Sequence, residues 1–122
     1  MKHMKKNPNI LKYLKLLPQR ITVKVEKNLD EEGYWAKIME LPHCYTQAST
    51  ISELAGMVTD AIQTHFEIPE KYKKNLGYYV PVSEKHLQLE EIFRKLVSIE
   101  QKVSQGKEVK AVFQRAEYAV VC

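Results

Sequence analysis

Carboxylates are the first residues to consider for chemistry in this sequence, because converging carboxylates can hold the metal ions that cleave phosphodiester bonds. A two-metal site needs acidic side chains that place two cations about 3.5–4 Å apart. The middle of the segment 21–27 carries Thr22, Val23 and Lys24, so no acid stands where such a site would need it. The remaining candidates fall in a turn, at a strand end, in a helix cap or on a polar helix face. They are Asp30, Glu31, Glu32, Glu40, Glu53 and Asp60. We therefore expect no catalytic residue.

Histidine and cysteine give no better arrangement for catalysis or metal binding. His43 and Cys44 are neighbours in sequence, and neighbours in an extended strand point to opposite faces. Cys44 and Cys122, the two cysteines of the chain, form neither a disulfide framework nor a metal-ligand spacing. His65 stands at the end of an apolar helical stripe, where we expect a half-buried packing residue. We expect no metal and no cofactor.

Two predicted strands and the turn between them carry four of the six carboxylates considered above. Residues 21–27 alternate apolar and polar side chains, which predicts a half-buried strand. Gly33 ends the polar turn that follows, where a positive φ is expected, and residues 34–41 return as the hairpin partner. In this second strand Tyr34, Ala36 and Ile38 share one face. Trp35 and Met39 lie on the other, where only a further part of the chain or a partner can cover them.

An amphipathic helix follows the hairpin. Thr50 and Glu53 have the spacing of a capping box, and Pro69 is expected to end the helix. The apolar stripe that should pack on the sheet is Ile51, Leu54, Ala55, Val58, Ala61, Ile62, His65 and Phe66.

The order of short motifs across residues 21–66 resembles the HicB-like antitoxin domain of bacterial type II toxin–antitoxin pairs. The matching positions are Glu32, Gly33, Tyr34, Trp35, Ala36, Glu40, Leu41, Pro42, Cys44, Thr46, Gln47, Thr50, Glu53 and Ala61. His43 and Ala48 replace glycines of the family pattern, and Ser49 replaces an acidic residue. The resemblance implies a truncated ribonuclease H-like fold with the order β-β-β-α-β. Its fourth strand is supplied either by residues 78–80 or by the end of the chain.

Composition and charge restrict the remaining possibilities. With 122 residues, 44% hydrophobic and 28% charged, the chain has the composition of one ordinary globular domain. The net charge of +4 suits a partner that carries negative charge, either nucleic acid or an acidic protein surface. No run approaches the roughly 18 apolar residues that span a bilayer, and lysines interrupt the first 20 residues where a signal peptide would be apolar. We expect a cytoplasmic protein without a membrane contact.

The chain divides into three parts. Residues 1–20 form an N-terminal extension, either a frayed leader or a short helix over a sheet edge, and residues 21–82 form the core. Residues 83–122 contain a helix and one or two strands, which pack on the core or on a dimer partner. A heptad-like seam on that helix is the alternative oligomer contact, with the residues Leu89, Ile92, Leu96, Ile99 and Val103. A helix-turn-helix centred on Gly106 is not favoured, because the residues that follow alternate like a strand.

These observations together predict an α+β fold with a small antiparallel-rich sheet, one helix across it and an additional C-terminal helix and strand. The resemblance implies an antitoxin that covers the active site of a small basic HicA-like, mRNA-cleaving toxin. The alternatives are a stand-alone homo-oligomeric domain or a DNA-binding regulator. The expected protein-binding surface is apolar and aromatic with an acidic flank. It comprises Trp35, Met39, Tyr45, Asp30, Glu31 and Glu32.

Overall fold

The computed structural model of the chain describes residues 8–29, 32–82 and 89–116. Its helices are α1 (Pro8–Leu16), a 3-10 turn η1 (Ile51–Glu53), α2 (Leu54–His65), α3 (Glu70–Lys73) and α4 (Leu89–Ser104). Its strands are β1 (Arg20–Lys27), β2 (Tyr34–Ile38), β3 (Tyr45–Ala48), β4 (Tyr78–Pro81) and β5 (Val109–Ala116). The predicted α+β fold is confirmed. Within the described residues, no helix has both the length and the apolar character needed to cross a membrane.

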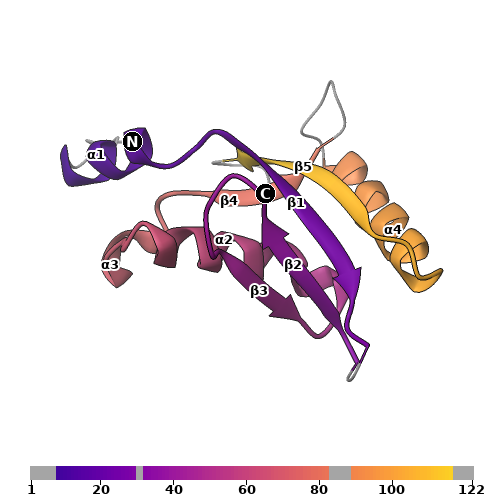
Figure 1. Cartoon of the computed structure of the whole chain (residues 1–122). Coiled ribbons are helices and arrows are strands. Elements are labelled where there is room, and N and C mark those ends of the chain that lie inside the picture. Colours follow the sequence, from indigo (N-terminus) through magenta and orange to yellow (C-terminus); the bar gives the residue numbers. More distant parts are fainter. Residues whose placement is uncertain (1–7, 30–31, 83–88, 117–122) are drawn as a thin grey trace.

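The five strands form one sheet in the order β3-β2-β1-β5-β4, and each pair of neighbours is antiparallel (Figure 1). Both candidates for the additional strand are therefore present, with β4 at the edge that Pro81 allows. The last described strand, β5, runs antiparallel to β1. A tight turn at Gly106, whose φ is +84°, follows α4 and returns β5 in the direction opposite to β1. The C-terminal strand thus lies inside the sheet, between β1 and β4.

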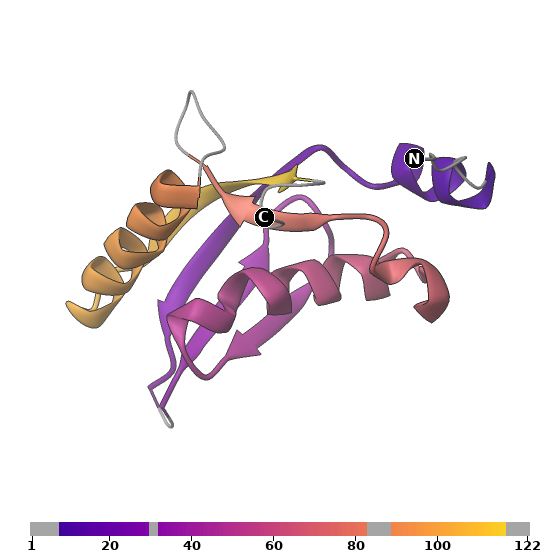
Figure 2. The same cartoon turned by 180° about the vertical axis from the view of Figure 1, so that it is seen from behind.

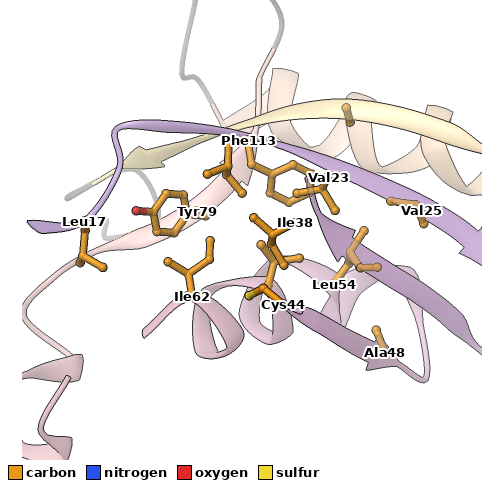
Figure 3. Packing of buried hydrophobic residues seen from close by; sticks show 14 of the residues in the cluster. Leu17, Val23, Val25, Ile38, Cys44, Ala48, Leu54, Ile62, Tyr79 and Phe113 are labelled. Atoms are coloured by element: carbon orange, nitrogen blue, oxygen red, sulfur yellow. The ribbon is translucent and has the colours of Figure 1, made fainter. Parts of the chain in front are cut away.

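Two helices, α2 and α4, lie on the same side of the sheet (Figure 2). The core between them and the sheet collects the alternate residues of the strands: Ile21, Val23 and Val25 from β1, and Ala111 and Phe113 from β5. The helices contribute Leu54, Val58, Ile62, Ile99 and Val103 (Figure 3 shows several of these side chains). Because one face of the sheet takes both helices, the described residues leave the other face uncovered.

The start and end of α2 differ in detail from the sequence expectation. A 3-10 turn precedes the helix, so the Glu53 carboxylate accepts a hydrogen bond from the Ser49 N–H at 3.2 Å rather than from Thr50. The helix ends at His65, before Pro69, because Glu67 takes a φ of +56°. Ile68 N–H then donates to the Gln63 carbonyl at 3.0 Å, which is the Schellman pattern of a helix end.

The apolar seam of α4 packs against its own chain. Ile92, Leu96, Ile99 and Val103 are all buried, and the Leu89 side chain lies outside the described residues. The sheet and α2 of the same chain therefore pack against this seam. The face of α4 that remains exposed carries Phe93 and Val97 instead.

Tyr79 connects the edge strand β4 to the segment before β1. Its ring is buried, its hydroxyl donates to the Pro18 carbonyl, and its backbone N–H donates to the Thr59 hydroxyl at 2.8 Å. Burial raises the pKa of Tyr79 to about 12. A tyrosine in the unfolded chain ionises near pH 10. The unfolded chain therefore releases its proton first, and this contribution to stability is complete below about pH 10 and is lost as the pH rises towards 12.

Tyr79→Phe should make the chain less sensitive to alkaline pH. The variant loses one hydrogen bond, so it should be less stable by about 1 kcal/mol near neutral pH. Between about pH 10 and 12 it should then lose less stability than the parent chain, as measured by urea unfolding. Tyr78→Phe, on the exposed neighbouring residue, is the control and should leave the parent pH profile unchanged. An identical alkaline loss in the parent and Tyr79→Phe would contradict this assignment.

Candidate binding site on the open face of the sheet

The uncovered face of the sheet, called the open face below, is built by the residues that alternate with the core positions. Cross-strand partners share a face, so the register assigns its members. They are Arg20, Thr22, Lys24 and Glu26 of β1, Trp35 and Lys37 of β2, Tyr45 and Gln47 of β3, and Lys110, Val112 and Gln114 of β5. Figure 1 views this side, and no described helix crosses in front of β1, β2 and β3.

An apolar patch lies at the β2–β3 half of the open face. Trp35 is 41% exposed, Tyr45 is 52% exposed and Met39, which continues the alternation of β2, is 40% exposed. Trp35 and Tyr45 border a shallow hollow of about 330 Å³, together with Lys24, Glu26 and Lys37. The structure therefore brings the three predicted apolar residues to one side of the molecule and leaves them accessible.

The predicted acidic flank of this patch is only partly described, and cations lie nearer to the patch. Glu32 is exposed in the turn before β2, and Asp30 and Glu31 lie outside the described residues. The charged neighbours of Trp35 and Tyr45 in the hollow are Glu26, Lys24 and Lys37, which alternate with core residues along β1 and β2. The described part of the open face carries four cations and one carboxylate, so it is more basic than the sequence suggested.

Three of the carboxylates that were considered for catalysis make a local contact. Glu40 accepts the Thr22 N–H at 2.8 Å, and Glu53 accepts the Ser49 N–H. Asp60 lies 3.7 Å from the Lys73 ammonium. No group of three His, Cys, Asp or Glu side chains in the described ranges is arranged to hold a metal ion.

His43, His65 and Cys44 lie beside the edge strand β3, where Tyr45 separates them from Trp35. His43, Asp60 and His65 border a hollow of about 280 Å³ between β3 and α2. His65 is exposed rather than half-buried, because α2 ends at this residue and its ring turns edge-on to Phe66. Cys44 is buried, its thiol donates to the Ala61 carbonyl at 3.6 Å, and burial raises the pKa of that thiol. Cys44 is thus part of the buried core.

Comparison with known proteins identifies the family. No protein-family model matches the chain, and no solved structure matches it. A curated protein of Archaeoglobus fulgidus, named UPF0150 protein, is 38% identical over 58 residues. The match covers 75% of that protein and 47% of this chain. The chain belongs to the UPF0150 family. This family is HicB-like, so the membership agrees with the resemblance that the motifs of residues 21–66 indicated.

The cations of the open face are the part of this UPF0150 site that sequence reasoning missed. Lys24, Lys37 and Lys110 each occupy a polar position in a strand with alternating residues, so each one was expected to point away from the core. Their alignment depends on the position of β5 beside β1, which no local pattern specifies.

Proposed function

We propose that this UPF0150 chain is an antitoxin-like protein-binding domain that neutralises a small HicA-like, mRNA-cleaving toxin by covering its active site. Membership of a HicB-like family supports the proposal. The observation that carries it is the exposed apolar patch of Trp35, Met39 and Tyr45 on a sheet face that the described chain leaves uncovered. Exposed aromatic residues of this kind commonly act as the anchors of protein interfaces.

The charges of the open face constrain how a basic toxin would bind. Lys24 and Lys37 would repel a basic surface placed over the centre of the sheet, whereas Glu32 in the β1–β2 turn would attract it. We therefore expect the apolar residues of the partner to cover Trp35. Its basic residues should lie towards the turn. The complex would then combine an apolar centre with a charged rim at one end.

Binding to the product of the neighbouring reading frame tests the proposal, with Trp35→Ala as the decisive variant. We expect co-purification of the parent chain with a small basic protein, and a loss of about 2 kcal/mol, roughly 30-fold in Kd, for Trp35→Ala in titration calorimetry. The matched control is Phe93→Ala, which removes an aromatic side chain that is 65% exposed on α4. It should change Kd by less than about twofold. Equal losses in the two variants, or the absence of any complex, would contradict the proposal.

A second copy of the chain is the alternative partner, and one feature favours it. Phe93 and Val97 stand one helical turn apart on the exposed side of α4, beside a shallow hollow of about 430 Å³. A homo-oligomer formed there would reverse the roles of the two variants above. Phe93→Ala would weaken self-association in light scattering, and Trp35→Ala would not.

A further inference from the structure

Three lysines form a row across the open face. Lys24 on β1 is the direct cross-strand partner of Lys37 on β2 and also of Lys110 on β5. Because cross-strand partners share a face, the three lysine side chains extend from the same face of three adjacent strands. With strands about 4.8 Å apart, the Cα atoms of Lys37 and Lys110 are separated by roughly 10 Å. We call these three residues the lysine row.

The lysine row is electrostatically unfavourable in the absence of a bound anion. Like charges that stand directly opposite one another in a sheet are destabilising. Glu26 lies 3.4 Å from Lys24 and compensates part of this repulsion. Arg20, on the same face of β1, adds a further cation, and its guanidinium donates to the Gln114 side chain at 3.1 Å. A polyanion placed across the sheet would offset the repulsion that remains.

Aromatic rings border the lysine row on the side of β3. The Lys37 ammonium lies 5.8 Å from the centre of the Tyr45 ring, and Tyr45 is the cross-strand partner of Lys37. Trp35 lies beside Glu26 in the register and shares the hollow with Tyr45. Two accessible rings on a sheet next to a line of amines match a ligand that has both flat bases and phosphates.

We propose that the open face binds single-stranded nucleic acid, with phosphates over the lysine row and bases stacked on Trp35 and Tyr45. A duplex keeps its bases stacked inside, so it offers these rings no base face. The inference goes beyond the antitoxin-like function and does not depend on it. A protein partner on the apolar patch would use the same two rings, so the two ligands would exclude each other.

Fluorescence of Trp35 provides a direct test, because Trp35 is the one tryptophan of the chain. The probe is an oligouridine of about 12 nucleotides, within the length range that a small single-strand-binding fold covers. At about 50 mM salt we expect saturable quenching of the Trp35 emission, caused by base stacking. For three phosphate contacts the logarithm of the binding constant should fall with the logarithm of salt concentration with a slope of about −2.

Charge-neutralised variants locate the binding site. Lys37→Gln combined with Lys110→Gln should weaken binding at least about tenfold and reduce the magnitude of the salt slope by about 1.4. The matched control neutralises Lys74, which follows α3, and Lys102 on α4, two exposed lysines, and should retain the parent affinity. Anisotropy of a labelled oligouridine allows the same comparison for Trp35→Ala, which should weaken binding, and Trp35→Phe, which should retain most of it.

Four results would overturn the inference. They are no saturable quenching at low salt, equal losses in the two lysine pairs, equal affinity for a duplex, and equal affinity for a polyglutamate of similar charge. The last result would show a site for any polyanion rather than for stacked bases. Because the purified chain alone is used, failure here leaves the toxin-binding proposal unaffected, and failure to find a toxin leaves this inference unaffected.

Discussion

Replacing Phe113 by alanine should lower the free energy of unfolding by about 3–5 kcal/mol, the usual cost of removing a fully buried aromatic side chain. Phe113 is completely buried in the core and belongs to β5, which lies between β1 and β4. Its loss leaves a cavity against Ile21, its cross-strand partner, in the middle of the sheet. Urea unfolding followed by circular dichroism measures the change.

Val112→Ala is the matched control for Phe113→Ala. Val112 is the preceding residue of the same strand, but it points to the open face and is 40% exposed. Its truncation should cost no more than about 0.5–1 kcal/mol. If the two substitutions have similar small effects, then β5 is not part of the sheet core in solution, and the register that aligns the lysine row would be wrong.

Gly33→Ala should be the second most damaging substitution, with a cost of at least about 3 kcal/mol. Gly33 has a φ of +112°, and a Cβ atom built there would lie 2.6 Å from the Ala48 carbonyl oxygen. The substitution therefore adds backbone strain to a clash with the backbone at the end of β3. Because Gly33 also accepts the Asn28 N–H that closes the hairpin turn, β1–β2 and β2–β3 pairing should weaken together. Chemical denaturation gives the magnitude.

Two other glycines separate the causes of this effect. At Gly106, with a φ of +84° and open space around the added atom, alanine should cost only the strain, about 1 kcal/mol. At Gly56, which lies on the exposed side of α2 with open space around it, alanine should stabilise the chain by about 0.5–1 kcal/mol. A cost at Gly33 no larger than that at Gly106 would show that the close approach to Ala48 does not exist.

The hairpin and α2 were predictable because their signals are local. Alternation in residues 21–27 and helical spacing from Leu54 to Ile62 each repeat several times. The structure buries the large apolar residues of both patterns, and in α2 it also buries Thr59 and Gln63, which the pattern did not select. The positive φ at Gly33 followed from the turn chemistry. The end of α2 did not, because a glutamate, Glu67, adopts the left-handed conformation that usually indicates a glycine.

The position of β5 could not be predicted from the sequence. Its strand character follows from the alternation at Val109, Ala111 and Phe113. Its insertion between β1 and β4 instead depends on pairing between residues about 90 positions apart, such as Ile21 with Phe113. The lack of a sequence signal for this long-range pairing also limited the prediction of the binding site. Exposure of Trp35 followed from its place in β2, whereas the lysine row required the register of three strands.

Solvent exposure of Trp35, before and after a partner binds, is the most direct test of the claim that the open face is a docking surface. The chain can be labelled with fluorotryptophan at its one tryptophan and studied by fluorine NMR in ordinary and heavy water. For the free chain we predict a large solvent isotope shift of the Trp35 resonance. On addition of the small basic product of the neighbouring reading frame, that shift should be lost. A Trp35 resonance that is already insensitive to solvent in the free chain, or one that stays sensitive in a stable complex, would contradict the claim.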